Sequence, residues 1–134
     1  MSIKHHRRYA ALAVAGVAAL AIPATGLARS SHSVNMKLVG KLSGVTITGT
    51  AKGKPFGNCT NKAKLIIPNE VQVWTCKGGK VTIKSHGTTG AANAAKGTWK
   101  VTKGTGKFKG ITGHGTFSGL QSTGKFTYKG TVSY

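Results

Sequence analysis

Very few side chains in this sequence are suited to acid–base or nucleophilic chemistry. Glu70 is the single acidic residue among the 134 residues, and aspartate is absent. Catalysis by paired carboxylates needs two acids, and a serine–histidine relay is usually completed by an acid beside the imidazole. One glutamate supports neither arrangement, so we predict that the protein is not an enzyme and that it has no catalytic residue.

The histidines and serines leave one weaker alternative. His32, His86 and His114 follow the first 28 residues. A dyad between Ser85 and a neighbouring imidazole stays open, although no spacing singles it out. Two histidines without carboxylate or free thiolate partners do not complete a metal site. We therefore predict neither a bound metal ion nor another cofactor.

The two cysteines predict a disulfide. A hairpin with loop residues 66–69 would place Leu65 opposite Glu70 and Cys59 opposite Cys76. Two cysteines in an exported chain most simply pair, and a loop of this length predicts a stabilisation of about 3 kcal/mol. The alternative is a pair of buried free thiols.

The N-terminal residues predict export. A basic start is followed by an apolar run from Ala10 to Ile22 and then by the small residues Gly26 and Ala28. This order is typical of a signal peptide, and the run is shorter than the roughly 20 residues of a membrane-spanning helix. We predict a signal peptide at 1–28, a flexible tail at 29–34 and one domain at 35–134, in a protein that is secreted or held at the cell surface.

The exported part is strongly basic. Residues 29–134 keep 17 of the 20 basic residues, because Lys4, Arg7 and Arg8 precede them, and with Glu70 as the only acid their formal charge is about +16. Lysine far outnumbers arginine in them, which favours attraction between point charges over sequence-specific recognition of nucleic acid. Lysines that alternate with apolar residues are the candidate polyanion-binding residues: Lys80, Lys84, Lys100, Lys107, Lys109, Lys125 and Lys129.

A repeat in the C-terminal third indicates the elements that carry these side chains. A glycine and an aromatic residue two positions later recur every nine residues, and the aromatic members are Trp99, Phe108, Phe117 and Phe126. Residues two apart on a strand share a face, so each glycine lies beside its aromatic ring. We predict that these four rings form part of the core.

Alternation of polar and apolar residues extends over most of the chain and predicts eight strands. Their expected bounds are 36–42, 44–51, 63–67, 70–77, 80–85, 97–103, 113–119 and 125–133. Glycine-rich turns separate them, and no helix of three turns is evident after residue 28. Eight short strands in about 100 residues favour an all-β fold, a small closed antiparallel barrel of calycin-like architecture, with a β-sandwich as the alternative.

The segment from Trp99 to Phe117 resembles the allene oxide cyclase and dirigent-like barrels and the small secreted bacterial proteins similar to them. Its matching features are Trp99-Lys100-Val101, the glycine-rich stretch 104–113 and Gly115-Thr116-Phe117. The resemblance implies an eight-stranded antiparallel barrel. The family's acidic cavity residues have no counterpart in the matching segment, so no catalytic residue is carried over.

Binding is the function that these features favour. The leading hypothesis is electrostatic attachment to extracellular polyanions, such as wall polymers, acidic polysaccharide or an anionic membrane surface. One alternative is a carrier or dirigent-like barrel that holds a small apolar molecule, and another is a cationic antimicrobial protein. The lysines would otherwise serve solubility alone. The presence or absence of a cavity inside the barrel separates the carrier from the other hypotheses.

Overall fold

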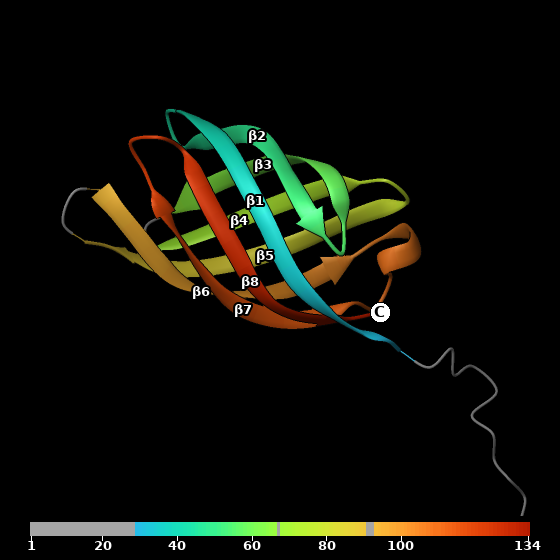
Figure 1. The fold of residues 1–134 in the computed structure, drawn as a ribbon. Coiled ribbons are helices and arrows are strands. Elements are labelled where there is room, and N and C mark those ends of the chain that lie inside the picture. Colours follow the sequence, from blue (N-terminus) through green and yellow to red (C-terminus); the bar gives the residue numbers. More distant parts are fainter. Residues whose placement is uncertain (1–28, 67, 91–92) are drawn as a thin grey trace, which may run out of the picture.

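The computed structural model describes residues 29–66, 68–90 and 93–134, which form a closed barrel of eight antiparallel strands (Figure 1). The predicted signal peptide lies outside the described residues. The strands are β1 (Ser31–Ser43), β2 (Thr46–Lys54), β3 (Gly57–Ile66), β4 (Asn69–Cys76), β5 (Gly79–Thr89), β6 (Ala94–Gly104), β7 (Thr112–Leu120) and β8 (Lys125–Ser133).

The barrel closes through its first and last strands. Each strand pairs with the next one along the chain, and β1 also pairs with β8, from Ser31 opposite Ser133 to Val39 opposite Lys125. Closure leaves no strand with an unpaired edge, which protects a chain rich in β-branched residues from edge-to-edge association. The predicted all-β barrel is confirmed, and the β-sandwich is excluded.

The N-terminal boundary differs from the prediction. Residues 31–34 are not a loose tail but the first part of β1, and Val34 is buried. The backbone N–H of Ser30 also donates to the carbonyl of Tyr134 at 3.2 Å. These residues are ordered because the C-terminal strand offers them a partner, which the local sequence does not reveal.

The cysteine hairpin has the predicted register. Leu65 pairs with Glu70 in the β3–β4 ladder, and a disulfide joins Cys59 to Cys76. The strands continue closer to the turn than expected, because Ile66 still pairs with Asn69. Strand β3 is also six residues longer at its start than its apolar pattern suggested.

Three aromatic members of the glycine–aromatic repeat lie on strands: Trp99 on β6, Phe117 on β7 and Phe126 on β8. Trp99 is buried on the inner face, and its indole N–H donates to the carbonyls of Thr116 and Lys129 at 3.1 and 3.2 Å. A Cβ added at Gly130 would lie 2.9 Å from the Trp99 ring, so the glycine makes room for the indole.

The repeat fails at its second member. Phe108 is buried, but it lies in the short 3₁₀ helix η2 (Gly106–Phe108) and not on a strand. Gly106 has a φ of 61°, and a Cβ there would lie 2.1 Å from the carbonyl oxygen of Gly78. The glycine therefore allows the chain to turn inward and deliver the ring to the interior.

Packed aromatic rings fill one end of the barrel, which we call the closed end. Phe108 makes edge-to-face contacts with Phe56 and Tyr134, with ring centroids 5.3 and 5.1 Å apart. Phe56 also contacts Trp74 edge-on at 5.8 Å. The disulfide, η2 and both ends of the described chain lie at this end, at the right of Figure 1.

Candidate functional site: a cavity at the open end of the barrel

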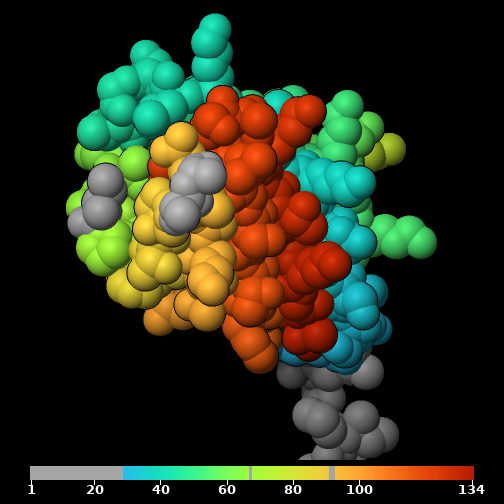
Figure 2. All heavy atoms as spheres, turned by 60° about the vertical axis from the view of Figure 1, so that its left-hand side comes forward, coloured from blue at the N-terminus to red at the C-terminus, as the bar shows by residue number. Residues whose placement is uncertain are grey.

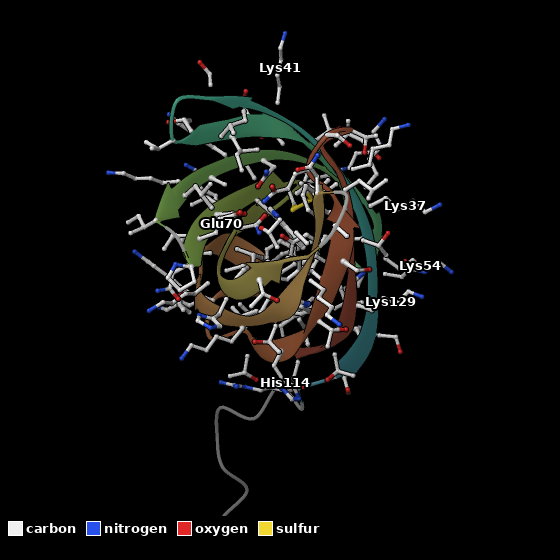
Figure 3. All side chains as sticks on the ribbon, turned by 90° about the vertical axis from the view of Figure 1, so that its left-hand side faces the viewer. Lys37, Lys41, Lys54, Glu70, His114 and Lys129 are labelled. Atoms are coloured by element: carbon white, nitrogen blue, oxygen red, sulfur yellow. A yellow bond between two sulfur atoms is a disulfide. The ribbon has the colours of Figure 1, made fainter. Side chains whose placement is uncertain are left out.

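The opposite end of the barrel, which we call the mouth, contains a cavity of about 320 Å³. The β1–β2, β3–β4, β5–β6 and β7–β8 connections all lie at this end (Figure 1). Figure 3 looks into the mouth along the barrel, and Glu70 lies within the ring of strands while Lys37, Lys54 and Lys129 point away from it.

The wall of the cavity is largely apolar. Two of the predicted core aromatics, Phe117 and Phe126, are only partly buried and line this space, whereas Trp99 and Phe108 are fully inside. Phe117 and Phe126 therefore pack against the core but are not enclosed by it, because the barrel interior is not filled at this end. The other apolar lining residues are Leu38, Leu42, Ile47, Leu65, Pro68 and Ala95.

A network of buried polar groups, which we call the polar floor, adjoins the apolar wall of the cavity. The indole N–H of Trp74 donates to Gln72 Oε1 at 2.8 Å, and Gln72 Nε2 donates to the hydroxyl of Tyr128 at 2.7 Å. Ser85 Oγ lies 3.4 Å from the same Nε2. An indole only donates, so it fixes which end of the Gln72 amide is the acceptor. The Tyr128 oxygen therefore accepts a hydrogen bond from Gln72, and its own proton can be donated to Ser85 Oγ or to an acceptor in the cavity.

Glu70 supplies a carboxyl group to the same space. It lines the cavity from the start of β4, and burial raises its pKa above the ordinary value. Burial also raises the pKa of Tyr128, and the charge of Glu70 raises it further, against the hydrogen bonds from Gln72 and Ser85 that lower it. Tyr128 is thus a neutral hydrogen-bond donor at physiological pH, and Glu70 holds a proton at a higher pH than an exposed glutamate.

The described groups of the cavity do not form a serine–histidine dyad. Ser85 points inward while His86 is exposed and lies 3.1 Å from Asn69 Oδ1 through its Nδ1, so the serine–histidine alternative is not assembled. The hydrogen-bonding neighbours of Ser85 are the Gln72 amide N–H and the Tyr128 hydroxyl, and neither is an imidazole or a carboxylate. Among the described residues, no cluster of three or more histidine, cysteine or acidic side chains can hold a metal ion.

The outer wall carries the positive charge. All 16 lysines of residues 29–134 are exposed, including the seven proposed from the sequence, and the one acidic side chain is inside. Lys107 also lies over the Phe108 ring at 5.0 Å. Alternation explains this arrangement, since the lysines of each strand share the face opposite the core residues.

A shallow groove crosses the outer face of β5 to β8. Its volume is about 670 Å³, and its basic side chains are His86, Lys96 and Lys129. The remaining polar lining consists of hydroxyl groups from Thr88, Thr98, Thr116, Ser118 and Thr127. The seven predicted lysines do not converge here, because only Lys129 belongs to the groove.

The glycine-rich segment 104–106 does not form an anion cradle. The amide of Thr105 donates to the carbonyl of Lys80, and that of Lys107 donates to the carbonyl of Gly78. Both N–H groups are used within the barrel, so the glycines serve the inward turn.

In the ranges that the structure describes, no helix is long and apolar enough to cross a membrane.

The polar floor of the cavity was not predicted from the sequence, although one signal for it was present. Inward positions on β4 recur every second residue, and the disulfide places Cys76 inside. Counting back by twos from Cys76 gives Trp74, Gln72 and Glu70, the residues that form or approach the floor. Ser85 and Tyr128 come from β5 and β8, and no local pattern links them to β4.

Comparisons of the chain with models of protein families, with curated proteins and with solved structures found no match.

Proposed function

We propose that this protein binds a small, mainly apolar molecule in the cavity at the mouth of the barrel and carries it without chemical conversion. The observation that supports this most is a cavity of about 320 Å³ whose wall is largely apolar and whose floor carries a few convergent polar groups. Ligand pockets of proteins typically have this composition and a volume of about 300 Å³ or more.

The floor indicates the polar group of the ligand. The Tyr128 hydroxyl can donate its proton to a ligand acceptor, because its oxygen already accepts from Gln72. Glu70 would repel an anionic group when it is ionised, since both would share a low-dielectric space. The ligand class that fits is a neutral molecule with an apolar body and one hydrogen-bond acceptor, such as a ketone, an ester or an ether.

The resemblance of the segment Trp99 to Phe117 to dirigent-like barrels is consistent with this proposal. It adds the expectation that the chain is a small secreted relative that holds its ligand in the barrel interior. We propose a binding protein and not an enzyme, because the single acid in the cavity has no second acid or base beside it.

Ligand affinity tests the proposal directly. Binding of a medium-chain methyl ketone is compared with binding of the alkane of equal length by calorimetry or native mass spectrometry. Tyr128→Phe should weaken ketone binding by about tenfold, as expected for one lost hydrogen bond, and should leave alkane binding nearly unchanged. Tyr134→Phe, at the closed end, is the matched control and should bind both probes like the parent. If neither probe binds saturably, or if Tyr128→Phe binds ketone like the parent, the proposed ligand class is wrong.

A second function, binding of acidic polysaccharide or another extracellular polyanion, is supported by the outer wall. Its lysines meet no acidic side chain among the described residues, and the groove of Lys96 and Lys129 adds hydroxyl groups that suit a sugar chain. Heparin affinity should fall steeply with added salt, as counterion release requires. If the groove is the site, the double variant Lys96→Gln/Lys129→Gln should lose more heparin affinity than Lys52→Gln/Lys62→Gln. If all exposed lysines of the outer wall contribute, the two double variants should lose the same affinity. Heparin binding that is absent at low salt, or unchanged by salt, would overturn this second function.

A further inference from the structure

Apolar side chains are exposed at the mouth of the barrel. Six large apolar residues of the described chain are strongly exposed, and the two on the outer wall are Val39 and Val71. The other four lie on strand ends and turns at the mouth, and we call them the apolar rim: Leu42, Val45, Ile66 and Leu120, exposed by 57, 56, 58 and 44%. Within the described ranges, the turns of the closed end carry none of these residues.

The apolar rim comes from three separate hairpins. Leu42 and Val45 belong to the β1–β2 hairpin, which stands out at the upper left of the space-filling view in turquoise (Figure 2). Val45 falls within the expected strand 44–51, but it lies in the turn after β1. Turns usually carry polar side chains, so apolar residues on three hairpins of one end mark an interaction surface.

Lysines lie next to the apolar rim. Lys41 precedes Leu42, Lys125 pairs with Leu120, and Lys64 pairs with Thr46 beside Val45. Figure 3 shows Lys41 extending away from the barrel at the β1–β2 hairpin. We call Lys41, Lys64 and Lys125 the rim lysines. Glu70, the single acidic residue of the sequence, lines the cavity and does not neutralise them from outside.

We propose that the mouth of the barrel docks on an anionic lipid bilayer, with the apolar rim inserted among the headgroups and the rim lysines against the lipid phosphates. Shallow insertion of apolar side chains together with lysine attraction is the combination that holds a protein on such a surface. A bilayer fits better than a soluble polyanion, because a polyanion offers no apolar layer to cover the rim.

Docking in this orientation places the cavity entrance against the lipid. Under the proposed carrier function, an apolar ligand would then pass between bilayer and cavity without crossing water. The docking itself depends only on the rim, so it is tested with ligand-free protein and stays distinguishable from ligand binding.

Vesicle sedimentation tests the docking surface. Vesicles of phosphatidylglycerol and phosphatidylcholine in equal parts should bind the protein, and vesicles of phosphatidylcholine alone should bind it far less. The triple variant Val45→Ser/Ile66→Ser/Leu120→Ser avoids Leu42, which also lines the cavity. It should lower the vesicle partition coefficient by about 50-fold, because three inserted apolar side chains are lost. Heparin binding of the same variant should equal that of the parent, and an unchanged circular dichroism spectrum verifies its fold.

Matched lysine variants separate docking through the mouth from attraction by all exposed lysines of the outer wall. Lys41→Gln/Lys64→Gln/Lys125→Gln removes three charges at the mouth, and Lys54→Gln/Lys77→Gln/Lys109→Gln removes three at the closed end. The mouth variant should lose about fivefold in partitioning per lysine, and the closed-end variant much less. Equal losses in the two variants, parent-like binding of the serine variant, or no binding to anionic vesicles would overturn the proposal. Self-association of the parent that the serine variant abolishes would assign the rim to a second copy of the chain and overturn it as well.

Discussion

The two ends of the barrel are built from the same strands but are filled differently. At the closed end, Phe56 and Phe108 reach the interior from a turn and a 3₁₀ helix and complete a cluster of edge-to-face rings. At the mouth, Phe117 and Phe126 stay on strands and line a cavity of about 320 Å³. Trp74 on β4 contributes to this cluster, but Phe56 and Phe108 are added to it by connections that fold inward. The filled closed end and the cavity at the mouth therefore differ mainly in what their connections contribute to the interior.

The division also separates stability from binding. The closed end holds the disulfide and the buried rings of Phe56 and Phe108, and the mouth holds the polar floor, the partly buried rings of Phe117 and Phe126, and the apolar rim. Binding sites are commonly assembled on the less tightly packed part of a rigid scaffold. We expect substitutions at the closed end to change mainly the free energy of unfolding, and substitutions at the mouth to change mainly binding.

The largest expected effect is that of Phe108→Ala. This ring is fully buried among other rings, so its removal should cost about 3–5 kcal/mol of unfolding free energy, as for large-to-small changes in a core. Phe126→Ala at the mouth is the control and should cost roughly 1–2 kcal/mol, because a half-buried ring leaves no new enclosed void. Denaturant unfolding measures both. Equal costs would contradict the division into a packed and an open end.

Removal of the disulfide should have the next largest effect. The bond joins residues 17 apart in sequence, and the double variant Cys59→Ala/Cys76→Ala should lose about 3 kcal/mol on the chain-entropy estimate. Ligand and vesicle affinities of the folded variant should stay close to those of the parent, since the bond lies at the closed end. A loss of ligand affinity at a temperature where the variant remains folded would show that the two ends are coupled.

A smaller effect should come from Glu70 and depend on pH. Burial raises its pKa in the folded state, so its contribution to stability is fully present below the unfolded pKa and is lost as pH rises through the folded pKa. Stability of the parent relative to Glu70→Gln should therefore fall as pH rises from about 4 toward 7. Thermal unfolding of both proteins across this window measures the difference, and a difference that is constant with pH would place the carboxyl in water.

The smallest effect concerns Asn61, which is buried beside Trp74 in the β3–β4 register. Neither polar atom of its amide has a hydrogen-bond partner among the described residues. An unpaired buried amide is costly, so Asn61→Val should raise the unfolding free energy by about 1 kcal/mol. Asn61→Asp is the comparison and should lower stability at neutral pH, because it buries a charge. A loss of stability in Asn61→Val would show that the amide is hydrogen-bonded in solution.

The sequence by itself determined the wall of the barrel. Alternation predicted all eight strands, the lysines that face outward and the hairpin register that brings Cys59 to Cys76, because each of these depends on the two-residue period of a strand. The period breaks at Phe56 and Phe108, whose positions depend on turns. The start of β3 was missed for a similar reason, since its small and polar residues carry no apolar pattern.

The tertiary structure alone decided what the barrel contains. Alternation tells which face a residue occupies, but its height along the barrel axis depends on how far each strand is staggered when β1 closes on β8. That stagger brings Glu70, Ser85 and Tyr128 to one cavity from three strands. It also leaves the mouth open while two rings from connections fill the other end. These are long-range contacts fixed by closure, so no stretch of the sequence carries them alone.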